Sequence, residues 1–194
     1  LSALNWSIGR HTVETGLWYE YGQFTEARYF SQAPLLGQGT LGDLNDHTPD
    51  NPFAVPWAEI WNTNTVQFHL QDTWRILPSL TLNAGFRSLV VRTGNEATQQ
   101  DPAYNGGTRV GTGALTASNA FLPQLSANWR FAPHNELFAD ISHNMRSFPE
   151  DGFGTNSSNT PWSANEAGFR QIQNTLKPET DWVYEGGYRL TTRP

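Results

Sequence analysis

The stretch NAFLPQLSANWRFAPHNELFADISHNMRSF, at residues 119–148, consists of two alternating segments around a short turn at residues 132–135. In the first segment Leu125, Ala127 and Trp129 share one face, and polar residues occupy the positions between them. The second segment alternates in the same way. Alternation with a period of two predicts β-strands that have one apolar and one polar face. We therefore expect a β-hairpin here, and the recurrence of this pattern along the chain extends the prediction to the whole sequence.

The recurring pattern predicts an all-β protein with about seven antiparallel strands in up-and-down order. We expect these strands at residues 1–8, 12–30, 57–76, 80–92, 119–131, 137–146 and 179–191. Very short turns alternate with loops of roughly 25 to 30 residues, at 31–56, 93–118 and 149–178, and loops longer than about 15 residues are uncommon in compact domains. Short turns at one end and long loops at the other are typical of a transmembrane β-barrel with periplasmic turns and extracellular loops.

Tryptophans lie near both ends of the predicted strands. Trp74 and Trp129 are close to short turns, whereas Trp57 and Trp61 are at the opposite end of their strand. Aromatic residues at the two membrane–water interfaces form girdles in such barrels. We therefore expect these four side chains to belong to the two girdles.

The composition excludes several classes of protein. The 194 residues carry a net charge of −6 and include a single lysine, Lys177, so nucleic-acid binding is not expected. With a mean hydropathy of −0.55, the chain has no apolar run of the roughly 18 residues that a transmembrane helix needs. The absence of cysteine excludes disulfides, zinc fingers and thiol nucleophiles. Eight tryptophans and many glycines favour an all-β fold.

Three groups of motifs, in order along the chain, resemble those of TonB-dependent outer-membrane receptors. They are Q-D-T-W-R at 71–75 with L-T-L-N-A-G-F-R at 80–87, F-L-P-Q-L at 121–125 with E-L-F-A at 136–139, and L-K-P-E-T at 176–180 with Y-E-G-G-Y-R at 184–189. The resemblance covers residues 57–189 well and the earlier part more loosely. It implies that residues 1–194 are a segment from the later part of a barrel of about 22 strands. The plug domain and the C-terminal strands of such receptors are expected to be absent from this segment.

The resemblance also implies a function. Receptors of this family sit in the bacterial outer membrane and take up a scarce ligand, such as a ferric siderophore, cobalamin or an oligosaccharide. The expected partners are TonB, a plug domain, outer-membrane lipid and the small-molecule ligand; no enzyme activity and no cofactor are expected. The alternative is a soluble all-β carbohydrate-binding module. The two differ in the apolar face, marked by Leu82, Phe86, Leu125 and Tyr184, which a soluble sandwich buries against a second sheet.

Two sets of side chains are candidate site residues. Aromatic residues in or beside the long loops are candidates for ligand contact, although interface anchoring and loop packing explain them equally well: Trp57, Trp61, Tyr104, Phe153 and Trp162. Charged residues on the polar face are candidates for a charged lumen, with cross-strand ion pairing as the alternative: Glu20, Arg87, Arg130, Arg146, Glu185 and Arg189.

Other motifs have simpler explanations. The G-x-G-x-x-G match at residues 37–42 is not followed by a helical pattern, so a flexible loop is favoured over a dinucleotide site. The acidic cluster Asp43, Asp46, His47 and Asp50 does not have the spacing of an EF-hand, which favours a solvated loop. His69 and His143 lack a paired ligand pattern, and neither a metal site nor a catalytic group is predicted.

Overall fold

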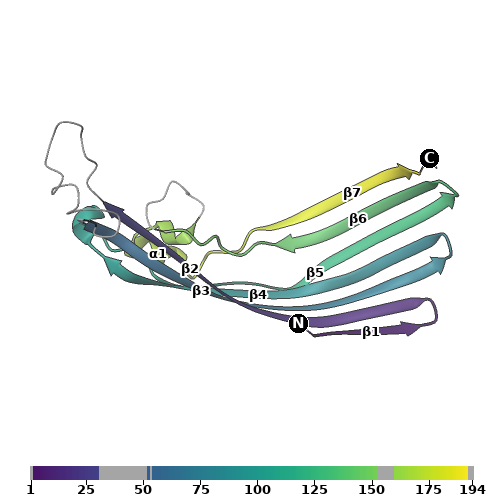
Figure 1. The fold of residues 1–194 in the computed structure, drawn as a ribbon, viewed down its shortest axis with the longest axis horizontal. Helices are drawn as coiled ribbons and strands as arrows, with labels where there is room; N and C mark the ends of the chain where they lie inside the picture. Colours follow the sequence, from purple (N-terminus) through teal and green to yellow (C-terminus); the bar gives the residue numbers. More distant parts are fainter. Residues whose placement is uncertain (1, 31–51, 53, 153–159, 192–194) are drawn as a thin grey trace, which may run out of the picture.

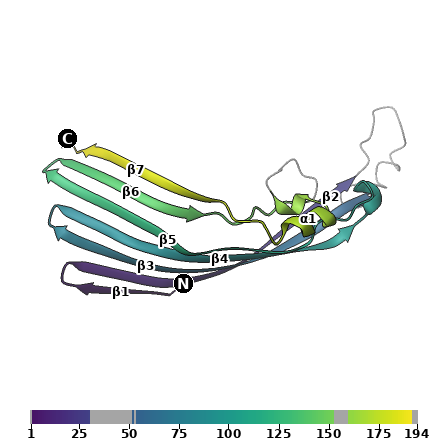
Figure 2. The same ribbon diagram turned by 180° about the vertical axis from the view of Figure 1, so that it is seen from behind.

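The computed structural model describes residues 2–30, 52, 54–152 and 160–191 of the chain. Seven antiparallel strands form one sheet in which each strand pairs with its neighbours in the sequence. They are β1 (Ser2–Ile8), β2 (His11–Phe30), β3 (Ala54–Leu77), β4 (Leu80–Gln100), β5 (Gly113–Ala132), β6 (Asn135–Met145) and β7 (Thr180–Leu190). Figures 1 and 2 show this sheet from two sides, open between β1 and β7. The prediction of an all-β, up-and-down fold is confirmed.

Three tight turns join the strands at one end of the sheet. They are formed by Gly9 and Arg10, by Pro78 and Ser79, and by Pro133 and His134. Gly9 has a φ of 61°, a left-handed conformation that a residue with a side chain rarely adopts. The three predicted short turns are therefore confirmed, and the longer connections lie at the opposite end (Figure 1).

The predicted loop at residues 93–118 is wrong. Strand β4 continues to Gln100 and β5 begins at Gly113, so the connection is only residues 101–112, with a short 3-10 helix η1 (Pro102–Tyr104). Thr93 and Asn95 remain in the ladder opposite Leu115 and Gly113. The Gly, Thr and Asn residues here give no apolar alternation, although Thr93 and Asn95 are buried on the polar face, because a segment distant in the sequence covers this end of that face. Strand β3 also begins earlier than predicted, at Ala54 rather than at Trp57. There the carbonyl of Pro56 accepts hydrogen bonds from the backbone N–H of Asp101 and the side chain of Asn105.

One face of the sheet, the apolar face, carries hydrophobic side chains from strand to strand. Cross-strand partners on it include Leu17 with Phe68, Leu70 with Phe86, Leu125 with Ile141, and Ile141 with Tyr184. Leu125 is 45% exposed and Tyr184 is 70% exposed. Within the described ranges no second sheet covers these side chains, contrary to what the soluble-module alternative requires. Such exposure suits contact with lipid rather than with water.

On the opposite, polar face, the described residues that cover the sheet lie at the end away from the short turns (Figure 1). There the residues between β6 and β7 include a 3-10 helix η2 (Pro161–Ser163) and a short helix α1 (Glu166–Ile172). Both views place α1 at this end of the sheet (Figures 1 and 2). Among the residues that the structure describes, no helix is long and apolar enough to cross a membrane. The buried hydrophobic core lies between this connection and the sheet.

Candidate functional site

The connection between β6 and β7, residues 146–179, is here called the insert; its described parts are 146–152 and 160–179. Helix α1 begins after Asn165, whose side chain accepts a hydrogen bond of 2.8 Å from the backbone N–H of Gly168. This capping satisfies a donor that the helix itself leaves free. Glu166 lies in the first turn, where a negative charge suits the helix dipole. The loop predicted at 149–178 therefore contains regular structure in its described part, residues 160–179.

Four side chains, here called the aromatic anchor, hold the insert against the polar face. Trp162 and Phe169 from the insert pack with Trp61 of β3 and Leu115 of β5, and Phe148 packs against their edge. Trp61, Trp162 and Phe169 have no exposed surface. The rings of Trp61 and Trp162 meet edge to face with centroids 6.4 Å apart, and Trp162 and Phe169 stack at 6.2 Å. These contacts fix the insert over the inner side of the sheet.

The position of the insert also depends on two hydrogen bonds and one close approach. The indole Nε1–H of Trp162 donates to the carbonyl of Gly113 at 3.2 Å. The backbone N–H of Gly111 donates to the carbonyl of Ala164 at 3.1 Å. A Cβ atom at Gly111 would lie 2.7 Å from that carbonyl and 2.8 Å from the Cβ of Phe169. The glycine at this position therefore permits contact between the β4–β5 connection and the insert.

The predicted aromatic site residues have different environments. Trp57, Trp61 and Trp162 are brought to the insert, where they are 2%, 0% and 0% exposed. Tyr104 lies apart on η1, 46% exposed, with its ring 6.0 Å from that of Phe30. Phe153 falls outside the described residues. Their contact with ligand stays a prediction.

The expected membrane girdle at the loop end is wrong for Trp57 and Trp61. Their side chains point to the inner side, and a Cβ atom at Gly152 of the insert would lie 2.2 Å from the Trp57 ring. Strand alternation places both residues on the polar face, where Trp61 is the ladder partner of Asn95. At the short-turn end, Trp74 and Trp129 are on the apolar face and are 39% and 47% exposed, as expected.

Carboxylates gather where the insert meets β2 and β3. Glu59 is completely buried and accepts a hydrogen bond of 3.1 Å from the Asn95 amide. Its cross-strand partner is Glu26, whose Oε2 accepts the backbone N–H of Gly152 at 2.8 Å. Asp151 of the insert is next to Glu26 and also accepts from that N–H. In the described part of the chain, no group of three or more His, Asp or Glu residues is arranged to hold a metal ion.

The carboxyl group of Glu26 has a shifted pKa. Glu26 lies near the end of β2, beyond the apolar band of Leu17, Tyr19 and Tyr21, and so outside the part of the strand suited to the membrane. Burial raises the pKa of Glu26 above its usual value of 4.5, and the hydrogen bond from Gly152 opposes this rise. The neighbouring Asp151 raises the pKa further, because it shares a hydrogen bond with Glu26 and because two like charges repel.

This shift predicts that acid stabilises the contact between β2 and the insert. Because the folded pKa is above the unfolded one, the folded state binds more protons, and stability falls as the pH rises through the raised pKa. The stabilisation is fully present only below the unfolded pKa of 4.5. Glu26→Gln keeps an oxygen for the Gly152 N–H but removes the charge, so we expect it to protect the insert at neutral pH and to abolish the pH dependence. Hydrogen exchange of residues 146–152, measured from pH about 4 to about 7, tests this.

The matched control for this prediction is Glu20→Gln. Glu20 is on the same strand and face but is exposed, and its Oε2 accepts from Trp18 Nε1 at 3.3 Å rather than from the insert. If Glu20→Gln changes the exchange of residues 146–152 as strongly as Glu26→Gln, the effect is one of general charge and the assignment to Glu26 is wrong.

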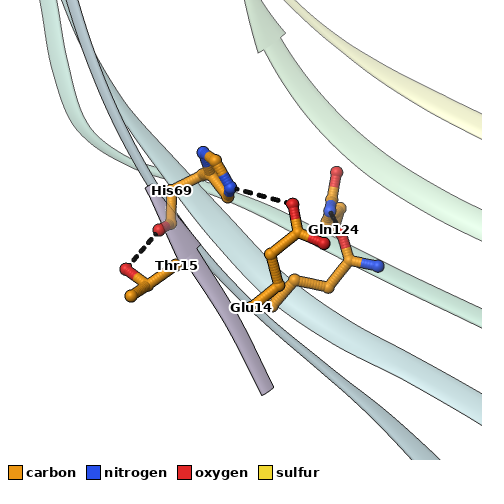
Figure 3. A network of polar contacts seen from close by, with 5 residues as sticks. Glu14, Thr15, His69 and Gln124 are labelled. Carbon is orange, nitrogen blue, oxygen red and sulfur yellow. Dashed lines mark hydrogen bonds and ion pairs between the residues drawn. The ribbon is translucent and has the colours of Figure 1, made fainter. Parts of the chain in front are cut away.

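Towards the short turns, the polar face is a wall of hydrogen-bonded side chains (Figure 3). His69 Nε2 lies 3.3 Å from Glu14 Oε1 on this face. From the apolar face, the hydroxyl of Thr15 donates to the backbone carbonyl of His69 at 2.8 Å. Gln124 of β5 donates to Gln71 of β3 at 2.9 Å. The strand between them contributes Gly85, which is the ladder partner of both glutamines. A glycine on β4 therefore leaves room for a side-chain bridge between two non-adjacent strands.

Five of the six predicted charged residues lie on this polar face: Glu20, Arg87, Arg130, Glu185 and Arg189. The sixth, Arg146, directly follows the end of β6. Arg189 Nη1 forms an ion pair with Glu136 at 2.7 Å, which agrees with the cross-strand alternative for this residue. Arg87 donates to Asn144 at 2.8 Å. Contact with a passing ligand or a plug stays a prediction for all six.

The structure brings to the site five residues that the sequence alone does not predict. They are Phe169 and Asp151 of the insert, with Glu26, Glu59 and Leu115 below them. Asn165 followed by Glu166 is a helix-start signal, and it would have indicated α1. No comparable local signal marks Glu59, because its burial results from a segment that is distant in the sequence.

The comparisons with known proteins agree with this architecture. The family model described as TonB dependent receptor-like, beta-barrel matches residues 2–193, which is nearly the whole chain. No curated protein sequence matches this chain. The seven-stranded up-and-down sheet, its exposed apolar face and its hydrogen-bonded polar face are the features of such a barrel wall. The chain therefore belongs to the TonB-dependent receptor-like β-barrel family.

Proposed function

We propose that this chain forms part of the wall of an outer-membrane receptor that takes up a scarce ligand with energy delivered by TonB. The observation that carries the proposal is the pairing of two faces on one sheet. Exposed side chains such as Leu125 and Tyr184 suit lipid on one side, and the polar wall around Glu14, His69 and Gln124 suits an aqueous interior on the other.

Membership of the family supports the coarser part of this function. Its members are outer-membrane receptor barrels rather than enzymes, and TonB and a plug domain are their partners in full-length proteins. The open sheet supports the further proposal that residues 1–194 are part of a larger barrel. Strands β1 and β7 each pair on one side only among the described residues, and unpaired strand edges are not stable within a membrane.

The ligand is proposed to bind at the end of the sheet that carries the insert. This end brings together buried aromatic rings, carboxylates and cavities on the inner side, whereas the other end consists of tight turns. A ferric siderophore, cobalamin or an oligosaccharide are the ligand classes proposed for the receptor. Capture at this end, followed by rearrangement of the plug, would open the path inward.

The orientation can be tested with epitope tags in the full receptor expressed in bacterial cells. One tag is placed after Gly106 in the β4–β5 connection, and a second after Ser79 in the β3–β4 turn. We expect antibody to reach the first tag on intact cells and the second only after permeabilisation. Recovery of the protein in the soluble fraction, or the reverse labelling pattern, would contradict the proposal.

Energy coupling needs a separate measurement. Cells that express the receptor are grown on a scarce nutrient of each ligand class, with and without functional TonB. Uptake of one nutrient is expected to require both the receptor and TonB. If correctly oriented receptor supports the same uptake without TonB, active transport by this protein is excluded.

A further inference from the structure

The described parts of the insert line a half-open cavity of about 560 Å³ beside β6. Its walls come from the two ends of the insert, which meet where the backbone N–H of Arg146 donates to the carbonyl of Glu179 at 2.9 Å. Pro161, in the middle of the insert, forms a buried part of the wall. A cavity of this size suits a small organic molecule.

The chemistry of the lining is divided between charge and apolar surface. Arg146 and Lys177 are the two cationic side chains, and one carboxylate, Glu179, lies with them. Phe148, Ile172 and Leu176 are on the apolar part of the wall. Lys177 is the single lysine of a chain whose net charge is −6, so the excess of positive charge here runs against the overall balance.

Neither cation is already used in an ion pair within the described ranges. The ion pairs there are formed by other groups: His11 with Asp72, His69 with Glu14, Arg170 with Glu166, and Arg189 with Glu136. Both Arg146 and Lys177 are exposed, so their charged ends are accessible to a ligand in the cavity. An anionic group between them would gain charge-assisted hydrogen bonds.

Arg146 also connects this cavity with the inner side of the sheet. Together with Ser147 it lines a neighbouring cavity of about 500 Å³ that lies over Trp18, Glu20 and Gln67 of β2 and β3. Glu20 in turn lines a third cavity, of about 250 Å³, near Phe24 and Glu150. A ligand held by Arg146 would therefore be next to the polar face that forms the proposed interior.

We propose that the cavity of the insert binds a small anionic ligand with an apolar body, whose negative group lies between Arg146 and Lys177. This inference rests on the proposed function, because it takes the bound molecule as the cargo of the receptor. It narrows the ligand class: a neutral oligosaccharide has neither the charge for the two cations nor the body for Phe148, Ile172 and Leu176.

The test uses the full receptor purified in detergent and two probes of the same shape, naphthoate and its neutral amide, naphthamide. Equilibrium dialysis gives the affinity for each. We expect Arg146→Gln and Lys177→Gln each to weaken naphthoate binding by about ten- to hundredfold, the range for loss of a hydrogen bond to a charged group. Neither substitution is expected to change naphthamide binding. Lys177→Arg keeps the charge and should retain most of the affinity for naphthoate.

Arg170→Gln is the matched control. Arg170 is an exposed cation on α1 that pairs with Glu166 and does not line the cavity, so its loss should leave both affinities unchanged. Heat-modified gel mobility shows whether each variant is folded. Equal affinity of the unsubstituted receptor for naphthoate and naphthamide, or the same loss in Arg170→Gln as in Arg146→Gln, would overturn the inference.

The two proposals fail separately. If the epitope tags and the TonB dependence behave as expected but naphthoate does not bind, only the cavity inference is wrong. If naphthoate binds through Arg146 and Lys177 but uptake does not require TonB, the site stands and the proposed receptor function does not.

Discussion

Trp162→Ala is expected to release the insert from the sheet. Trp162 is completely buried, packs against Trp61 and Phe169, and donates to the carbonyl of Gly113. Truncation of a buried tryptophan costs about 3–5 kcal/mol through lost burial and the cavity that remains. Because α1 is short, it is not stable without this packing. We therefore expect fast hydrogen exchange in α1 and new protease cleavage within residues 160–179 of the folded receptor.

Tyr104→Ala is the control for this prediction. Tyr104 is also a large aromatic residue at the same end of the sheet, but its side chain is half exposed and does not belong to the aromatic anchor. Its truncation should leave the exchange of α1 unchanged. If Trp162→Ala leaves α1 as protected as in the unsubstituted receptor, the packing of Trp162 does not hold the insert.

Gly85→Val is expected to disrupt pairing in the middle of the sheet. A Cβ atom at this position would lie 2.5 Å from the carbonyl oxygen of Leu70 and 2.9 Å from the Cα of Gln71. Both atoms are backbone of the neighbouring strand β3, so a rotamer change cannot relieve the clash. Overpacking typically costs 1–3 kcal/mol, and we expect about 3 kcal/mol or more here because the ladder itself must shift. The urea midpoint of unfolding in detergent and the heat-modified gel mobility of the receptor measure the loss.

Gly22→Val provides the comparison. Gly22 is also a strand glycine on the polar face, but nothing lies within 4 Å of a Cβ atom at that position. Valine favours strands, so this change should be neutral or slightly stabilising. Equal destabilisation by the two substitutions would show that loss of glycine in itself, rather than the close approach at Gly85, is responsible.

The anchored insert bears on the ligand capture that we propose. A connection whose rings are buried against β3 and β5 is held in place, so it is suited to form a fixed wall at the outer end of the proposed path rather than to move over it. In that role the cavity beside Arg146 and Lys177 has walls that exist before the ligand arrives. Such preorganisation lowers the cost of binding. Trp162→Ala should therefore also weaken binding of the anionic probe.

The sequence by itself determined the number and order of the strands. Alternation such as that of Leu125, Ala127 and Trp129 against the polar residues between them reports which faces meet lipid and water, and each strand shows it locally. Turn residues such as Gly9, Pro78 and Pro133 indicated the tight turns, because Gly and Pro are local signals of a turn. Five charged residues were placed on the polar face by counting along these strands.

Only the tertiary structure decided what lies over the polar face at the loop end. Trp57 and Trp61 have the spacing of girdle residues, and Thr93 and Asn95 the composition of a loop, yet all four are buried in strands. Trp61 is buried by Trp162 and Phe169, and the Trp57 ring lies against Gly152. These insert residues are distant along the chain and reach the tryptophans because the insert folds back over the sheet. Period-two alternation indicates which environment each face of a strand contacts, but it does not identify a partner that is distant in the sequence. The strands could therefore be predicted from the sequence, whereas the anchored insert could not.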